Sequence, residues 1–402
     1  MFHLAQGRVL GYDQPMHIYL VGGAVRDMLM EAAGQDRDQG RDRDYMVTGA
    51  TVEEFLEAFP HAKQVGKAFA VFMVGHDEYA FPRGETLEDD LAARDLTVNA
   101  VAMPVEEARK PSVDLSQAVS AHPLAMDDIR NKVLRPASDT ALDDDPVRVF
   151  RAARFAAAWP DFTVHPDLTR AMAQTARQGL LDDLAPERVA AELRKAMLSP
   201  RPGRFLETLG EAGCLAPWFR ELARAHGIPA GPAPYHERSM LGHTAEVMDR
   251  LAAMRPGDEL AVWTGLCHDL GKTATPSHNH PHHHGHDALG EPMAERLGRR
   301  LAMPERFIKA GAAAAREHMR LARYHELRPG TRVDLLARLH SARITDELCS
   351  LVEADHGVNV RPEVLRDLEA ILSVTLPPED RDNGPESGEK LRLLRCQALA
   401  GN

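Results

Sequence analysis

The chain has 402 residues, of which 44% are hydrophobic and 5% aromatic, and its formal net charge is −12. This length exceeds what one ordinary hydrophobic core covers, so we expect a globular protein of two to four domains. A stretch of 18 apolar residues does not occur, which argues against a membrane-spanning helix, and the acidic balance argues against indiscriminate nucleic-acid binding.

The N-terminal segment and the cysteines both favour the cytoplasm. The segment MFHLAQGRVLGYDQPM lacks a basic region leading into an apolar one, so we expect no secretion signal. The four cysteines are widely spaced, without a pairing pattern, and we interpret them as reduced thiols: Cys214, Cys267, Cys349 and Cys396.

Residues 1–140 mix short β-rich runs with helical stretches, which predicts a small α+β head. A strand from His17 to Val21 is followed by Gly22 and Gly23, and then by a helix that contains Arg26. Glycines between a strand and a helix let backbone N–H groups approach a triphosphate at the helix start. A simple turn explains the pair of glycines equally well when they are taken alone.

Two carboxylates, Asp42 and Asp44, follow in the run RDRDYMVTG. If this run is a strand, both side chains point to the same face, where they form oxygen ligands for Mg²⁺. Together with the glycine turn they predict two-metal nucleotidyl transfer. Such a pair also arises by chance in a chain with 60 acidic residues, and the order and spacing of the two features favour function.

The run TLEDDLAARDLTVNA brings Arg94, Asp95 and Asn99 within a few residues. An arginine offers a planar fork of donors to phosphate oxygens, and Asp and Asn can hold a ribose hydroxyl. Taken alone, the run is explained better by a charged helix with a capping Asp followed by a strand.

The run DDDPVRVFRAARF predicts a helix that is capped by Asp145 and begins at Pro146. Arg148, Arg151 and Arg154 recur every three residues and so share one face of this helix. Capping and surface ion pairs are the simpler explanation of these charges.

Asp145 and Arg148 also present an acceptor beside a donor. Cytosine and adenine each offer an amino donor beside a ring-nitrogen acceptor, whereas uracil and guanine offer the reverse. This pair could therefore accept C or A and reject U and G without a nucleic-acid template.

The remainder of the chain is helical in pattern. We predict a neck and body over 141–228, a Gly/Pro-rich linker from Gly227 to Glu237, a second helical domain over 238–366, and a disordered tail over 377–402. From Glu291 to Arg343 the chain carries 12 Lys/Arg against 6 Asp/Glu, a local basic surface that suits RNA despite the overall charge.

The second helical domain contains the spaced pattern His243, His268-Asp269 and Asp355. Histidine and carboxylate side chains converging from separate helices suit a transition or other divalent metal, which would activate water to hydrolyse a phosphate ester.

Between His278 and Asp287 lies a histidine-rich segment. A loop that merely picks up metal ions is our preferred interpretation for His278, His280 and His282. For His283, His284 and His286, and for the more distant His318, we predict a second metal or a phosphate contact.

In order along the chain, LVGGAVRD, DRDYMVTG, EYA, TLEDDLAARDLTVNA, DDDPVRVFRAARF, LAPERVAAEL and the H…HD…D pattern cover Ile18 to Asn359. This ordered set resembles the bacterial-type (class II) tRNA nucleotidyltransferases that build or repair the 3′-terminal CCA, in the branch with an HD domain. The resemblance implies an α+β fold with a polymerase-β-like head and a small mixed sheet, an all-α neck and body, and an all-α HD domain.

The same resemblance implies roles for individual residues. It makes Asp42 and Asp44 the Mg²⁺ ligands and Asp145 with Arg148 the amino-acid template for the base, with Arg151 and Arg154 beside them. Gly22, Gly23 and Arg26 would hold the triphosphate, and Arg94, Asp95 and Asn99 would contact phosphate and ribose; Lys272 completes the HDxGK element, and Glu187, Arg188 and Glu192 match a structural neck motif. The HD domain would hold Ni²⁺, Co²⁺ or Mn²⁺ and hydrolyse 2′,3′-cyclic and 2′-phosphates.

The chain departs from the family pattern at one place in particular. EYAFPRGE, with Arg83 and Glu85, joins TLEDDL directly, whereas the family has a flexible loop of about twenty residues there. In the family this loop is associated with the switch from CTP to ATP, and members without it add only the two cytidines, 74 and 75. Ala93 also stands where a second arginine is usual, and of the next motif only Asp114 survives.

We therefore predict a CC-adding enzyme that binds tRNA and CTP, as a monomer or homodimer. Full CCA addition with CTP and ATP remains open if Arg83 and Glu85 can still reorganise the pocket. A poly(A) polymerase shares the head, but the HD domain argues against it. An HD phosphohydrolase with an inactive tRNA-binding head is the alternative from another class.

Overall fold

In the computed structural model, residues 16–32, 43–65, 71–84, 86–110, 112–233 and 238–400 are described. They form two compact units, one of residues 1–152 with 161–180, and one of residues 153–160 with 181–402. In the described part of the chain, no helix is long and apolar enough to cross a membrane. Asp42 and Glu85 lie outside the described residues.

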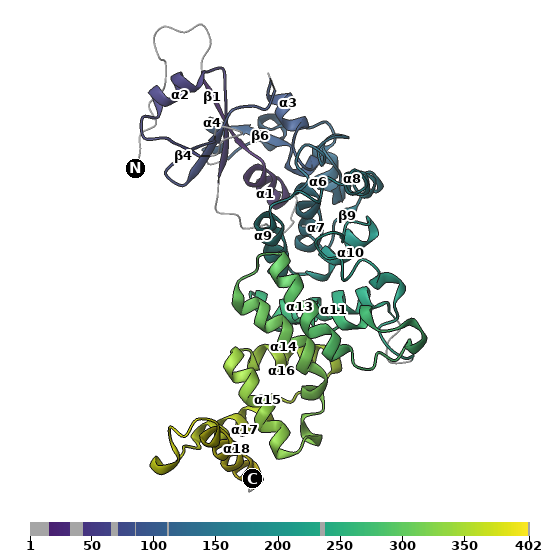
Figure 1. Cartoon of the computed structure of the whole chain (residues 1–402). Helices are drawn as coiled ribbons and strands as arrows, with labels where there is room; N and C mark the ends of the chain where they lie inside the picture. Colours follow the sequence, from purple (N-terminus) through teal and green to yellow (C-terminus); the bar gives the residue numbers. More distant parts are fainter. Residues whose placement is uncertain are drawn as a thin grey trace. The chain divides into compact units, whose positions relative to one another are not determined.

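The first unit is built on a seven-stranded sheet in the order β3-β4-β5-β2-β1-β6-β7. Figure 1 labels β1, β4 and β6 of this sheet. All neighbouring strands are antiparallel except β2 and β5, which run parallel, so the sheet is mixed as predicted. The strands are β1 (His17–Val21), β2 (Asp44–Thr48), β3 (Lys63–Val65), β4 (Val71–Val74), β5 (Asp77–Ala80), β6 (Val101–Pro104) and β7 (Ser120–Ala121).

The helices of this unit are short, because most of them only connect strands. They are α1 (Gly23–Ala32), α2 (Val52–Ala58), α3 (Leu87–Ala92), η1 (Thr97–Asn99), α4 (Val105–Ala108), α5 (Leu115–Ala118), α6 (Ala125–Asn131) and α8 (Pro166–Arg177). A buried cluster that includes Val21, Met46 and Ala102 joins strands β1, β2 and β6 to α3, and fixes the end of β1 from which the glycine turn leaves.

The second unit is helical. Helix α12 (Glu259–Cys267) is buried from Leu260 to Cys267, as expected for a helix that is apolar all round, and Trp263 Nε1 donates to the Phe307 carbonyl at 2.6 Å. Helices α9 (Pro186–Met197), α11 (Met240–Met254), α14 (Glu305–Ala322) and α16 (Thr345–His356) pack against it. The unit also contains α10 (Gly203–Glu211), η3 (Leu270–Ala274), α13 (His286–Arg300), α15 (Pro329–Ala342), α17 (Arg361–Ser373) and α18 (Pro385–Ala400).

Two local predictions need correction. Helix α7 (Arg148–Ala158) begins at Arg148 rather than at Pro146, since the preceding residues form a tighter turn in which the Arg148 N–H donates to the Asp145 carbonyl. The region predicted to be helical also contains strand β9 (Thr163–Val164), which pairs in parallel with β8 (Val133–Leu134). In the predicted Gly/Pro-rich linker, the Ala230 N–H donates to the Arg238 carbonyl.

The C-terminal segment also differs from the prediction of disorder over 377–402. Pro385 starts α18, a position where proline suits a helix, and good helix formers follow it. Arg392 pairs with Asp334 of α15, and Arg395 Nε donates to the Ile371 carbonyl of α17 at 3.0 Å. These contacts hold a helix that composition alone does not predict.

Candidate active sites

The glycine turn lies between β1 and α1, where it was predicted. Gly22 has φ +66°, a left-handed conformation that L side chains rarely adopt, and its N–H donates to the Val101 carbonyl at 2.9 Å. A Cβ at Gly22 would lie 3.2 Å from Arg94 Nη1. The turn therefore leaves Arg94 close to the backbone at the start of α1.

A buried hydrogen-bond network connects Arg26 to the Arg94–Asn99 segment. Arg26 Nη1 donates to Asn99 Oδ1 at 2.6 Å, and Asn99 Nδ2 donates to Asp95 Oδ1 at 2.9 Å. Arg151 Nε in turn donates to Asp95 Oδ2 at 2.8 Å. The structure thus brings together four of the predicted nucleotide-binding residues from α1, η1, the segment before it and α7.

The Asp95 carboxylate is ionised in this network. Burial disfavours its charge, but Arg151 and the Asn99 amide outweigh burial, so the pKa of Asp95 lies well below its usual range. Arg94 is paired separately, with its Nε 2.9 Å from Asp90 Oδ2.

Asp44 is exposed at the first position of β2, opposite Val21, the last residue of β1 before the glycine turn. On the other side of β2, Asp44 lies opposite Glu78 in the parallel pairing with β5. Side chains at paired positions of neighbouring strands point to the same face, so Glu78 adds a carboxylate beside Asp44. The EYA run contains Glu78 and was interpreted above only as a family motif, so Glu78 was not among the predicted metal ligands.

Arg148 is buried, and its Nη1 donates to the Ala141 carbonyl at 2.6 Å. Burial lowers the pKa of this guanidinium, while the Asp95 carboxylate opposes that effect, Arg83 adds repulsion and Asp145 again favours the charge. Arg148 is therefore held in place by the backbone within the electrostatic reach of Asp145, Asp95 and Arg83.

Arg154 has a different partner from its neighbours on α7. Its Nε donates to Glu192 Oε2 at 2.6 Å, both side chains are buried, and the guanidinium lies over the Phe155 ring at 4.0 Å. The structure therefore engages Arg154 with the neck helix α9, at the glutamate for which a structural role was predicted.

The connection from β5 to α3 spans residues 81–86 and is fastened to α3. Thr86 and Asp89 form a reciprocal capping box, the Arg83 N–H donates to Asp90 Oδ1 at 3.3 Å, and Arg83 Nη1 donates to the Ala93 carbonyl at 3.4 Å. A Cβ at Gly84 would lie 2.4 Å from the Asp89 Cβ, so the chain passes directly against the helix.

The second unit contains a buried cluster of histidine and aspartate. His243 Nε2 lies 3.1 Å from Asp355 Oδ1 and 3.4 Å from Asp269 Oδ2, and His268 Nε2 lies 3.1 Å from the same Asp269 oxygen. His286 and His318 approach the other Asp269 oxygen. The structure thus gathers the four predicted HD residues with two of the additional histidines.

The charges in this cluster compensate one another. Burial works against ionisation of Asp269, but its neighbours His268 and Lys272 hold the pKa of this carboxyl well below the usual range. Burial likewise works against protonation of His243, yet Asp269 and Asp355 raise its pKa to about 9. Burial lowers the pKa of His286 to about 4, so this ring is neutral at pH 7, as a metal ligand must be.

The remaining predicted residues of this unit either form hydrogen bonds next to the cluster or lie on the protein surface. Lys272 lies 2.6 Å from Asp269 Oδ2 and donates to the Ala230 carbonyl, which ties the described linker to the site. His283 contacts Thr275 Oγ1 at 2.6 Å and the Pro229 carbonyl at 2.8 Å instead of the cluster. His284 is exposed and stacks with His282.

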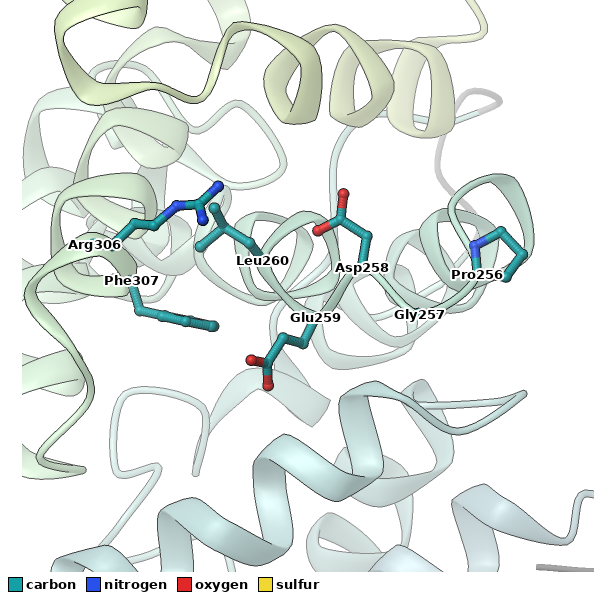
Figure 2. Close-up of a pocket in the computed structure, with 7 residues that line it drawn as sticks. All are labelled: Pro256, Gly257, Asp258, Glu259, Leu260, Arg306 and Phe307. Atoms are coloured by element: carbon teal, nitrogen blue, oxygen red, sulfur yellow. The ribbon is translucent and has the colours of Figure 1, made fainter. Parts of the chain in front are cut away.

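A surface hollow lies elsewhere in this unit (Figure 2). It is lined by the turn before α12 and by Arg306 and Phe307 of α14, and Figure 2 shows Asp258 and Glu259 pointing in opposite directions from that turn. Asp258 caps α12 and Glu259 pairs with Arg194. Asp258 and Glu259 are thus engaged by the protein itself, and the residues that line the hollow do not include any predicted site residue.

Three protein-family models match successive parts of this chain, in the same order as the motifs described above. Residues 18–135 match the family model described as the poly A polymerase head domain. Residues 161–225 match the probable RNA and SrmB-binding site of polymerase A, and residues 239–357 match the HD domain.

Full-length relatives are also similar in sequence. The multifunctional CCA protein of Stenotrophomonas maltophilia strain R551-3 is 37% identical over 422 residues, covering 96% of this chain and 99% of that protein. The corresponding protein of Xanthomonas campestris pv. campestris strain B100 is 35% identical over 423 residues, covering 96% and 98%. The chain belongs to the multifunctional CCA protein family.

Membership in the family confirms the predicted bacterial-type, class II tRNA nucleotidyltransferase with an HD domain. Divalent metals are implied for both the head and the HD domain. The fold is confirmed as well: the Thermotoga maritima CCA-adding enzyme complexed with tRNA has a TM-score of 0.63 at 18% identity, covering 96% of this chain and 88% of that one. A structure titled tRNA-processing enzyme (apo form I) has a TM-score of 0.58 at 20% identity, covering 95% and 92%.

Proposed function

We propose that this tRNA nucleotidyltransferase is a CC-adding enzyme. In each step the 3′-hydroxyl of the tRNA attacks the α-phosphorus of CTP, the bond to the β-phosphate breaks, and pyrophosphate leaves. The proposal that only cytidines are added is supported by the connection between β5 and α3. This connection is six residues long and is hydrogen-bonded to α3 at both Arg83 and Thr86.

A fastened connection of this length cannot perform the rearrangement that the longer family loop supplies. Its movement would break the Thr86–Asp89 capping box. It would also expose the Asp90 carboxylate, which accepts hydrogen bonds from the Arg83 N–H and from Arg94 Nε. Loss of a cap costs about 1 kcal/mol and loss of a hydrogen bond to a charged group about 1.5–3 kcal/mol. The segment therefore favours one arrangement, and we propose that this arrangement accepts CTP.

We propose that Asp44 and Glu78, with Asp42, hold the catalytic metal ions. The exposed carboxylates at the start of β2 and on β5 provide the hard oxygen ligands that Mg²⁺ prefers. When bound, such ions polarise the phosphorus and stabilise the charge on the attacking and leaving oxygens. The chain's own contribution is to hold Asp44 beside the Gly22 turn through the β1–β2 register and Glu78 beside Asp44 through the β2–β5 register.

We propose that the hydrogen-bonded residues Arg26, Asn99, Asp95 and Arg151 line the nucleotide-binding site. Arg26 donates to Asn99 and to Asp27, and Arg151 donates to Asp95, so these bonds fix the direction in which each guanidinium fork points. Asp145 and Arg148 select the base: the carboxylate accepts from the cytosine amino group, and the guanidinium donates to the ring nitrogen.

A second activity is supported by the cluster around Asp269. Buried, converging His and Asp side chains fit a divalent transition metal such as Ni²⁺, Co²⁺ or Mn²⁺. Asp269 Oδ1 has no hydrogen-bond donor among the described residues, although it is buried. We propose that the HD domain hydrolyses 2′,3′-cyclic or 2′-phosphates, which would clear damaged tRNA ends before nucleotides are added.

The restriction to CTP can be tested with tRNA that ends at the discriminator base. The purified protein and Mg²⁺ are incubated with CTP alone and with CTP plus ATP, and the products are resolved at single-nucleotide resolution. A stop at two added nucleotides in both reactions is expected. A third nucleotide that appears only with ATP would mean full CCA addition.

A further inference from the structure

Two hydrogen-bonded turns in succession, within residues 138–147, lead into helix α7. In the first turn the Asp143 N–H donates to the Thr140 carbonyl at 2.9 Å, and in the second the Arg148 N–H donates to the Asp145 carbonyl at 2.9 Å. Asp145 and Arg148, the pair to which we assign base selection, thus follow directly on the first turn. What holds the first turn in place therefore bears on the position of this pair.

Asp143 attaches the first turn to helix α8. Its Oδ1 accepts a hydrogen bond from Thr175 Oγ1 at 2.6 Å, and its Oδ2 accepts from the side-chain amides of Gln174 and Gln178 at 3.3 and 3.2 Å. Residues three and four positions apart share one face of a helix, so these donors form a single surface toward the turn. One carboxylate thereby receives three hydrogen bonds from α8.

The bond from Thr175 is the strongest of the three. Its hydroxyl has one proton and two acceptors within reach, Asp143 Oδ1 at 2.6 Å and the Ala171 carbonyl of its own helix at 3.1 Å. A hydrogen bond to a carboxylate is shorter and stronger than one to a neutral carbonyl, so the proton lies toward Asp143. Thr175 has no exposed surface, which keeps water from competing for this bond.

The guanidinium of Arg148 is tied to the same turn. Arg148 is buried, and its Nη1 donates to the carbonyl of Ala141, two residues before Asp143, at 2.6 Å. The Ala141 carbonyl moves with the turn, and the guanidinium moves with that carbonyl. A continuous series of hydrogen bonds therefore runs from α8 through Asp143 and the first turn to Arg148.

We propose that Asp143 is a positioning residue for base selection, which directs Arg148 toward the ring nitrogen of cytosine by fixing the first turn on α8. This inference rests on the base-selecting role proposed for Asp145 and Arg148. Uracil presents an N–H where cytosine has a ring-nitrogen acceptor, so a guanidinium held in place rejects it. A misplacement of about 1 Å costs on the order of 10²-fold in rate, and release of the turn would remove most of the advantage of cytosine.

The discrimination between CTP and UTP measures this role. Single-turnover addition to tRNA that ends at the discriminator base gives an efficiency for each nucleotide with the full-length protein, and the CTP-to-UTP ratio of efficiencies is compared between variants. Unfolded protein adds neither nucleotide, so a loss of stability lowers both efficiencies and leaves their ratio unchanged. The ratio therefore separates positioning from a merely structural effect.

Asp143→Ala should lower the ratio by about tenfold, chiefly through slower CMP addition. Asp143→Asn keeps an oxygen that accepts from Thr175 and should restore most of the ratio. Asp139→Ala, at an exposed aspartate of the same segment, is the matched control and should leave the ratio unchanged.

Thr175→Val tests the same bond from the side of α8, because valine keeps the shape of threonine and removes its hydroxyl. It should lower the ratio as well, and the double variant with Asp143→Ala should discriminate no worse than Asp143→Ala alone, since two substitutions that break one interaction are not additive. This second route keeps the inference testable if Asp143→Ala does not fold.

Arg148→Lys separates this inference from the proposed function on which it rests. The substitution replaces the planar fork with a single ammonium group and should lower the ratio. A reduced ratio in Arg148→Lys with an unchanged ratio in Asp143→Ala and Thr175→Val would overturn the role of Asp143 and leave base selection by Arg148 standing. An unchanged ratio in Arg148→Lys would overturn both.

Discussion

Asp44 and Glu78 lie opposite one another in the parallel pair of strands β2 and β5, and both are exposed; Asp44 also lies opposite Val21 at the end of β1. Parallel strands need a long connection between them, and here β3 and β4 lie in that connection. The pairing therefore brings together two carboxylates that are 34 residues apart in the chain (78 minus 44). It explains why Glu78 belongs beside the predicted metal ligands.

Glu78→Gln should reduce the rate of CMP transfer to tRNA by about 10²-fold or more, as loss of one group that stabilises the transition state does. The side chain is exposed, so the thermal unfolding midpoint should stay within about 2 °C. Glu106→Gln, at an exposed glutamate of α4, is the control and should keep full activity. Unchanged transfer in Glu78→Gln would remove Glu78 from the metal site.

Asn99→Ala should lower kcat/KM for CTP by about 10- to 100-fold. The substitution removes the acceptor of the buried Arg26 Nη1 and one donor to Asp95, and a hydrogen bond to a charged group is worth about 1.5–3 kcal/mol. Single-turnover incorporation with varied CTP measures the effect. Asn131→Ala, at an exposed position at the end of α6, should behave as the unsubstituted protein; a similar loss there would contradict a specific role for Asn99.

The Asp95 carboxylate should make folding sensitive to acid. Its folded pKa lies below the unfolded value of 3.8, so the stability it contributes is present above about pH 4 and is lost as pH falls below that value. Melting temperatures of the unsubstituted protein and of Asp95→Asn should therefore differ at pH 6 and converge toward pH 3. A difference that stays constant with pH would show that the charge is not responsible.

Sequence patterns alone predicted the features of both sites that depend on residues close together in the chain. The Gly22 turn, a strand that contains Asp44 and the His268-Asp269 pair depend on neighbours in the chain, and the structure has a turn, a strand and a helix end at these places. The predicted strand included Asp42 as well, and that residue lies outside the described part of the chain. Glu78 and the bond from Arg26 to Asn99 depend on tertiary pairing, which no local pattern encodes. Among the clustered histidines, sequence could not distinguish buried His286 from exposed His284, because only the start of α13 decides which ring turns inward.

The Arg154–Glu192 pair should matter for stability rather than for transfer. Glu192→Ala leaves a buried guanidinium without its partner, which costs about 3–5 kcal/mol, so urea should unfold the variant at a lower concentration. Glu187→Ala, at an exposed glutamate of the same helix α9, should change stability by less than about 0.5 kcal/mol. Equal effects of the two substitutions would argue against the buried pair as the cause.

Lengthening the β5–α3 connection should broaden nucleotide specificity. Insertion of roughly twenty residues of the flexible loop of a full CCA-adding relative before Thr86 is tolerable thermodynamically, since loop closure costs little per added residue. The chimaera should add a third nucleotide with ATP, whereas a Gly/Ser insertion of the same length should not. Continued arrest at two nucleotides in a folded chimaera would mean that specificity lies elsewhere.

The central claim concerns the last nucleotide, and tRNA that already ends in CC isolates that step. The unsubstituted protein is incubated with this tRNA, Mg²⁺ and ATP, and extension is followed on a sequencing-resolution gel, with CTP addition to tRNA that lacks both cytidines as proof of activity. The account predicts active CTP addition and no extension of the CC-ended tRNA with ATP. Efficient formation of a CCA end would contradict it.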